Sequence, residues 1–353
     1  MNSRLKSIHS QLKQRGLDGL LVSSPANISY LTESLSRDAY LLVSLKENIY
    51  FSDSRYTEEV KFFLKNNAVF KECNGYVFER IAETISSLGL KSIGFEERYL
   101  PFAEFSKIKE SAHGKFNLVP THSIVEDKRQ VKDAQEILKL REATRITALA
   151  LKHIHQLIVP GVKEVELVAE LERFIRYQGA RASAFDIIVA SGPNSSQPHH
   201  LSGERKLKAN ELVLIDFGVD YQGYKSDLTR VLFLGKISIL ERKVYDIVLK
   251  AQELAIKIIR PGAEMAEIDR VARDYIASQG YGACFTHNLG HGFGLEIHEA
   301  PHLSGREASA IKPGMTFTVE PGIYLPGKFG IRIEDMVLIT TKGCEVISGA
   351  IHK

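Results

Sequence analysis

The sequence is poor in cysteine, in long apolar runs and in net charge, and each shortage removes a class of protein. Its three cysteines, Cys73, Cys284 and Cys344, lie far apart and form no CxxC pair, so no disulfide framework is expected. No apolar run reaches the length of a transmembrane helix, so no membrane span is expected. The formal net charge of +3 is too small to indicate a nucleic-acid or membrane partner.

The N-terminal segment lacks the pattern of a secretion signal. Leu5, Ile8 and Leu12 recur at helical spacing, which predicts an amphipathic helix over the first turns of the chain. An apolar central stretch and a small-residue cleavage site are both missing. Together with the low cysteine content, this favours a reducing compartment and a cytoplasmic location.

Length and composition indicate an ordinary globular protein of about two domains. The 353 residues are 44% hydrophobic and 25% charged. The polar stretch 122–132 marks a boundary, and we divide the chain into residues 1–127 and 128–353. The first part is predicted to be an α/β domain without a metal-type cluster or a glycine-rich phosphate loop. Its expected strands are 19–22, 40–44, 48–52 and 92–95.

The second part is predicted to be α+β. A turn at residues 221–223 joins two strands into an antiparallel hairpin. The order of elements favours a mainly antiparallel sheet with helices on one face. The expected helices are 133–158, 163–178, 239–259 and 265–279, and the expected strands are 185–190, 211–220, 223–233, 315–320 and 331–340.

Three acidic residues of this second part are embedded in apolar sequence. Asp216 follows the run 212–215, Glu320 follows 317–319, and Glu334 lies next to Ile333. A carboxylate in a buried strand is costly unless it is paired, protonated or bound to metal. Taken singly, each acid is more readily explained as a solvated residue at a strand end, so only their combination indicates a site.

An internal repeat predicts that these acids converge. Two segments begin at Pro-Gly and end at Gln-Gly, 160–179 and 261–280, with an offset of 101 residues. Asp216 and Glu320 follow them at an offset of 104. Each half then offers a second acid, Asp227 or Glu334. Two such halves facing each other would bring four carboxylates to one point. With one imidazole, this set suits two hard or borderline divalent cations, which can activate water for hydrolysis.

The motifs of this region resemble those of the pita-bread metallopeptidases. The family comprises aminopeptidase P, Xaa-Pro dipeptidase (prolidase) and methionine aminopeptidase, with creatinase as a metal-free relative. The resemblance covers nearly the whole chain and implies a creatinase-like N-terminal domain followed by a pita-bread catalytic domain with an internal pseudo-twofold repeat. The segments that carry it are FDIIVASGPNSSQPHH, LIDFGVDYQGYKSDLTR, GHGFGLEIHEAP, TVEPGIY and GIRIED.

The resemblance implies roles for individual residues. No ligand position is replaced; the implied ligands are Asp216, Asp227, His291, Glu320 and Glu334. His199 would lie beside the substrate carbonyl, and His298 would contact the peptide and the tetrahedral intermediate, although either could be a structural buried histidine. Arg332 would hold a ligand carboxylate, and Glu320 would carry a proton to the leaving nitrogen. His302 and Tyr324 are further candidates for substrate contact.

The expected function is therefore hydrolysis of Xaa-Pro bonds in proline-containing peptides by a homodimeric exopeptidase. Two divalent ions per chain are expected, and manganese, cobalt, zinc or iron all tolerate such ligands. Many proline-specific relatives carry arginine directly after HExP, whereas here HEAP precedes His302, with Arg306 as a possible substitute. This difference favours aminopeptidase P activity, with prolidase close behind.

Three other functions stay open at this point. Methionine aminopeptidase is disfavoured by the long N-terminal domain, and a non-catalytic pita-bread binding protein is disfavoured by the intact ligands. Creatinase-like hydrolysis of a non-peptide amide would need no metal.

Overall fold

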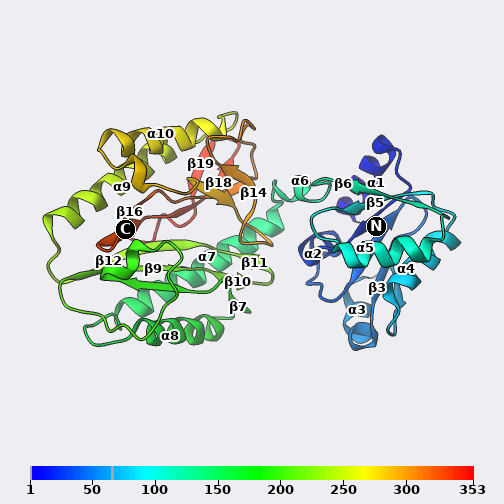
Figure 1. Ribbon diagram of the computed structural model, residues 1–353, viewed down its shortest axis with the longest axis horizontal. Coiled ribbons are helices and arrows are strands. Elements are labelled where there is room, and N and C mark those ends of the chain that lie inside the picture. The colour runs from blue at the N-terminus through cyan, green and yellow to red at the C-terminus, as the bar shows by residue number, and fades with distance from the viewer. Residues whose placement is uncertain (1, 65–66) are drawn as a thin grey trace. The chain divides into compact units, whose positions relative to one another are not determined.

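The computed structural model describes residues 2–64 and 67–353 (Figure 1). The chain forms two compact units, the first ending at Arg129 and the second beginning at Gln130. The division expected between residues 127 and 128 falls inside the short helix α6 (Glu126–Arg129) and stays a prediction. None of the helices in the described residues combines the length and apolar character that crossing a membrane requires.

The N-terminal unit is an α/β domain built on one six-stranded sheet of order β4-β3-β2-β1-β5-β6. β1 pairs antiparallel with β2 but parallel with β5. Leu21, Leu42 and Ile93 of the sheet share a hydrophobic core with Ile85 and Ile108 of the helices. The strands are β1 (Gly19–Val22), β2 (Tyr40–Ser44), β3 (Ile49–Ser52), β4 (Val69–Glu72), β5 (Ser92–Glu96) and β6 (Asn117–Thr121). The remaining helices are α1 (Ser3–Arg15), α2 (Pro25–Thr32), η1 (Ser54–Tyr56), α3 (Thr57–Phe63), α4 (Val77–Ser87) and α5 (Phe102–Ala112).

The C-terminal unit combines long helices with short strands, and the strand pairs within its sheets are antiparallel. In Figure 1, α9 and α10 lie on one side of the strands, and α7 and α8 lie on the other. The helices are α7 (Ala134–His155), α8 (Glu164–Tyr177), η2 (Gly192–Ser196), α9 (Ile239–Ile258), α10 (Met265–Ser278) and η3 (Gly282–Cys284). The strands are β7 (Ala182–Ser183), β8 (Ile188–Ser191), β9 (Glu211–Phe217), β10 (Val219–Tyr221), β11 (Tyr224–Lys225), β12 (Leu228–Leu234), β13 (Gly290–Gly292), β14 (Glu299–Leu303), β15 (Thr316–Val319), β16 (Gly322–Leu325), β17 (Phe329–Arg332), β18 (Asp335–Thr340) and β19 (Gly343–Val346).

The central strand β9 is shared between two hydrophobic cores. Successive side chains of a strand point to opposite faces. Val213 and Ile215 therefore pack with the buried residues of α7 and α8, whereas Leu212 and Leu214 pack with those of α9 and α10. Asp216 shares its face with Leu212 and Leu214, and its side chain lines a cavity of this unit. The apolar run before Asp216 thus fixes the face on which the carboxylate lies.

The single sheet expected from the sequence is wrong in detail, because the described strands form four smaller sheets in this unit. The expected strand 211–220 is interrupted at Gly218, where β9 gives way to β10. A Cβ atom on Gly218 would lie 1.8 Å from the carbonyl oxygen of Ser226, so only glycine allows the two chains to approach this closely. Asp227 follows this contact directly and is thereby placed opposite Asp216's strand. The expected helices on one face are also wrong, since helices flank the strands on both sides.

The internal repeat expected from the sequence is visible in the backbone pairing. Isolated bridges join Lys163 to Lys206 in the first half and Glu264 to Ala310 in the second, and these pairs are offset by 101 and 104 residues. The pair β9–β12 then corresponds to β15–β18, and both pairs are antiparallel. Each half therefore presents an acid at the end of the first strand of its pair.

Candidate functional site

The C-terminal unit contains a cavity of about 1040 Å³. This volume is at the upper end of the range typical of small-molecule sites and leaves room for a short peptide. The ten site residues expected from the sequence all line it: His199, Asp216, Asp227, His291, His298, His302, Glu320, Tyr324, Arg332 and Glu334.

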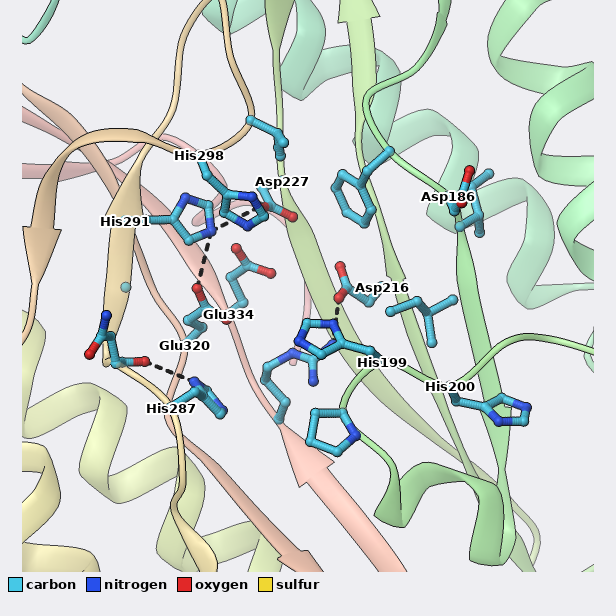
Figure 2. Close-up of a pocket in the computed structure, with 18 of the residues that line it drawn as sticks. Asp186, His199, His200, Asp216, Asp227, His287, His291, His298, Glu320 and Glu334 are labelled. Atoms are coloured by element: carbon cyan, nitrogen blue, oxygen red, sulfur yellow. Dashed lines mark hydrogen bonds and ion pairs between the residues drawn. The ribbon is translucent and has the colours of Figure 1, made fainter. Parts of the chain in front are cut away.

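Three acidic side chains form the centre of the cavity floor. One carboxylate oxygen from each of Asp216, Asp227 and Glu334 lies within 4.8 Å of the others. Figure 2 shows these carboxylates grouped together although they come from β9, the turn before β12 and the segment between β17 and β18. Their side chains are nearly or fully buried. The three acids are therefore not the solvated residues at strand ends that each would suggest if taken singly.

His291 and Glu320 complete the group. The Nε2 atom of His291 lies 3.4 Å from Oδ2 of Asp227 and 3.3 Å from Oε1 of Glu320. Thr318 links the two residues, because its hydroxyl accepts a hydrogen bond from the backbone N–H of His291 and donates one to Glu320. A Cβ atom on Gly290 would lie 1.9 Å from the carbonyl oxygen of Thr318, so the glycine before His291 permits this approach.

The electrostatics of the group fit a bound cation. Burial, together with the neighbouring carboxylates, raises the pKa of Asp227 and of Glu334 well above the usual range. Burial likewise raises the pKa of Glu320. Within the described residues, Oδ1 of Asp216 and Oε1 of Glu334 are buried without a hydrogen-bond partner. A divalent cation would offset the repulsion and coordinate these oxygens, so the residues present suit a metal site.

Arg332 and Thr229 hold two of the acids in place. The guanidinium group of Arg332 donates hydrogen bonds to Oδ2 of Asp216, to the hydroxyl of Thr229 at 3.0 Å and to the hydroxyl of Tyr324 at 2.7 Å. Thr229 in turn donates to Oε2 of Glu334 at 2.9 Å. Burial alone would lower the pKa of Arg332, but Tyr324 and Asp216 raise it well above its usual value, so the guanidinium stays charged.

The histidines around the acids differ in environment. The rings of His298 and His291 meet edge to face with centroids 4.3 Å apart. Burial and the neighbouring His291 lower the pKa of His298 to about 4, so its imidazole is neutral near pH 7 and can donate one N–H. His199 and His302 are exposed at the cavity wall, and His302 pairs with His291 across β13 and β14. Arg306 is exposed and is not among the cavity-lining residues.

Sequence reasoning missed two residues of this network. Thr229 gave no signal, since it lies in an apolar strand and meets Glu334 across 105 residues. His287 lines the cavity, and its Nε2 atom lies 3.1 Å from the hydroxyl of Tyr324. In the sequence, its place four residues before His291 was the one indication that it could belong to the site. The hydroxyl of Tyr324 is therefore engaged by both Arg332 and His287.

Two related halves that bring four acids and a histidine into one cavity define a metallopeptidase of the pita-bread fold. The model of metallopeptidase family M24 matches residues 138–341, and that of the creatinase/prolidase N-terminal domain matches residues 4–131. The chain belongs to metallopeptidase family M24 and is a metallo-exopeptidase that uses divalent metal ions.

Whole-chain comparisons agree with this assignment. The solved structure of an Xaa-Pro dipeptidase from Bacillus anthracis is 38% identical, with a TM-score of 0.94, covering 98% of this chain and 96% of that one. An X-Pro aminopeptidase from Thermotoga maritima is 36% identical, with a TM-score of 0.87 and coverage of 96% and 97%. The Xaa-Pro dipeptidase of Pyrococcus horikoshii is 34% identical over 97% of this chain and 96% of its own length.

Proposed function

We propose that this protein is a metal-dependent Xaa-Pro dipeptidase, which hydrolyses the bond between a residue Xaa and a C-terminal proline. The observation that carries the proposal is the convergence of four carboxylates and His291 in one cavity of a family M24 chain. Similarity over almost the full length to chains described as Xaa-Pro dipeptidases supports the substrate class.

The proposed ligands are the five residues expected from the sequence, and two ions per chain suit them. Four carboxylates and one imidazole are more than a single ion needs, and carboxylates can bridge neighbouring ions. When bound, divalent cations polarise the scissile carbonyl and lower the pKa of a water molecule. Manganese, cobalt, zinc and iron all remain compatible with this mixture of oxygen and nitrogen ligands.

The protein side chains supply orientation and proton transfer. Arg332 and Thr229 fix Asp216 and Glu334, so these carboxylates cannot rotate away from the cavity. Glu320 accepts a proton at its carboxylate from the attacking water and delivers it to the proline nitrogen as that bond breaks. This delivery is required because an amide nitrogen cannot leave as an anion and has to be protonated as the carbon–nitrogen bond breaks.

Neutral His298 is proposed to donate its N–H to the oxyanion that forms at the scissile carbonyl. Replacing it in His298→Ala is expected to lower kcat on the order of 100-fold, as the loss of one transition-state donor does, while metal content stays unchanged. Steady-state kinetics together with metal analysis of the purified variant measure both quantities. Unchanged kinetics would make His298 a structural residue.

One feature of the cavity favours a second candidate function, Xaa-Pro aminopeptidase activity on longer peptides. A dipeptidase has to recognise the carboxylate of proline, and arginine is suited to hold it at two points. Arg332 is the single Lys or Arg among the described residues that line the cavity, and Asp216 and Tyr324 already engage it. His302 stands where an arginine clamp was expected. The full-length similarities support the dipeptidase more strongly than this one residue supports the aminopeptidase.

The two candidates are separated by kcat/KM on Xaa-Pro and Xaa-Pro-Yaa with the same Xaa. We expect the dipeptide to be preferred, and a His302→Arg variant to increase that preference roughly tenfold, since a charged bidentate contact contributes well over 1 kcal/mol. Arg306→Ala serves as the matched comparison and should leave the ratio unchanged. A strong preference of the wild-type protein for the tripeptide would establish the aminopeptidase instead, and loss of dipeptide activity in Arg306→Ala would identify Arg306 as the clamp.

A further inference from the structure

The side chain of His199 is not fixed by a hydrogen bond within the described residues. It is exposed, lines the cavity, and makes no hydrogen bond to any residue in the described part of the chain. It lies in the segment that follows β8 and contains η2. This segment comes back to Glu164 at Gly203. The direction of the His199 imidazole therefore depends on how the backbone of this segment is held.

Glu164, at the first turn of α8, holds that segment at several points. Its carboxylate is fully buried and accepts hydrogen bonds from the backbone N–H of Ser191 at 2.7 Å, from the Ser191 hydroxyl at 2.6 Å and from the Asn194 amide at 3.0 Å. The backbone N–H of Gly203 lies 3.4 Å from the same carboxylate. One side chain thus contacts both ends of the loop and its middle.

His200 connects Glu164 to the cavity. Its Nε2 atom lies 2.9 Å from Oε2 of Glu164 and 3.2 Å from the Asn194 amide. Figure 2 shows the His200 ring turned away from the acidic group, whereas the adjacent His199 ring faces it. Because the two residues are consecutive, a contact that holds the chain at His200 also holds the backbone from which the His199 side chain projects.

The charge of Glu164 is retained in this buried position. Burial alone would raise its pKa, but the Ser191 and His200 donors outweigh burial and leave the pKa below the ordinary value. A buried carboxylate with this many donors is expensive to leave half satisfied, so the loop and the carboxylate stabilise each other. Nothing in the chemistry of hydrolysis requires this arrangement, since Glu164 is not among the cavity-lining residues.

We propose that Glu164 is a positioning residue for His199, acting through His200 and the backbone of residues 191–203. The inference rests on the proposed function and on the role that the family resemblance implies for His199, contact with the substrate beside the scissile carbonyl. Small displacements of a substrate-contacting group are costly, with a shift of about 1 Å reducing rates on the order of 100-fold.

The first test is Glu164→Gln, which keeps the size of the side chain but loses its charge and one acceptor atom. We expect kcat/KM on an Xaa-Pro substrate to fall about tenfold or more, with metal content unchanged, and amide hydrogens of residues 191–203 to exchange faster. Glu166→Gln is the matched control, because Glu166 lies in the same helical turn and, among the described residues, its carboxylate accepts a hydrogen bond from the backbone N–H of Lys163 alone. Equal behaviour of the two variants would overturn the inference.

His200 offers a second route that does not touch the buried acid. His200→Gln keeps a donor for Glu164, whereas His200→Phe keeps a ring of similar bulk without one. We expect the first to retain most of the activity and the second to resemble Glu164→Gln. If both lose activity equally, or neither does, the Glu164–His200 contact does not position the loop.

A double-mutant cycle separates failure of this inference from failure of the proposed function. If Glu164 acts through His199, adding Glu164→Gln to His199→Ala should lower kcat/KM no further. Multiplying effects in the double variant would mean that Glu164 only stabilises the fold. Normal kinetics of His199→Ala alone would instead remove His199 from the proposed mechanism, whatever the Glu164 variants do.

Discussion

Removal of divalent metal is expected to abolish peptide hydrolysis, and addition of a divalent ion should restore it. The reason is the buried group of four carboxylates and His291, in which the acids repel one another and two buried oxygens have no hydrogen-bond partner among the described residues. The measurement is activity on an Xaa-Pro substrate after chelation and after titration with manganese, cobalt, zinc or iron, with metal content determined in parallel.

Thermal unfolding gives a readout of metal binding that does not depend on activity. An ion that binds only the folded chain raises the free energy of unfolding, by about 2.7 kcal/mol at a hundredfold excess over Kd. The melting temperature should therefore rise with added metal. Full activity in a preparation shown to be free of metal would overturn the metal-dependent mechanism.

The second large effect is expected from neutral replacements of the ligands, Asp227→Asn and Glu334→Gln. Changing groups that merely orient metal ligands commonly reduces activity 10- to 100-fold, so loss of a ligand itself should exceed about 100-fold. Metal occupancy should fall together with the rate. Metal analysis and kinetics on the same preparations measure this, and unchanged occupancy in both variants would contradict the ligand assignment.

The same variants should affect stability in opposite directions with and without metal. In the metal-free protein, Glu334 is a buried carboxylate beside Asp216 and Glu320, so its neutral replacement should raise the melting temperature. With metal present, the wild-type protein should be the more stable. Asp220→Asn is a suitable control, because Asp220 is buried on the β10–β11 hairpin that precedes Asp227 but is paired with Arg181 and Lys225. It should lower stability in both states and leave metal occupancy intact.

The sequence alone was enough to select those candidate site residues whose neighbours along the chain are unusual. Asp216 and Glu320 stand out because each acid ends an apolar run, and the motifs around Asp227, His291 and Glu334 indicate the remaining proposed ligands. Contacts made across the fold left no such local pattern. Thr229 and Arg332 meet across 103 residues, and Glu164 and His200 across 36. Which donors surround a buried acid depends on tertiary packing, and alternation or spacing along the chain does not encode it.

The expected aminopeptidase P activity is less well supported than the prolidase alternative, and the reason is related. A single residue, His302 in place of arginine, directed the expectation towards aminopeptidase P. Similarity over nearly the full chain supports the dipeptidase better, because it reports on the whole cavity wall and not on one side chain. The expected homodimer and cytoplasmic location, which came from the resemblance and from composition, stay predictions.

The distribution of the site over the two halves has a consequence for biosynthesis. Arg332 meets Asp216 across 116 residues, and Thr229 meets Glu334 across 105. On the ribosome, Asp216 and Asp227 are made long before the residues that orient and complete them. A growing chain therefore holds no assembled peptide-cleaving centre until nearly all of its catalytic domain has been translated.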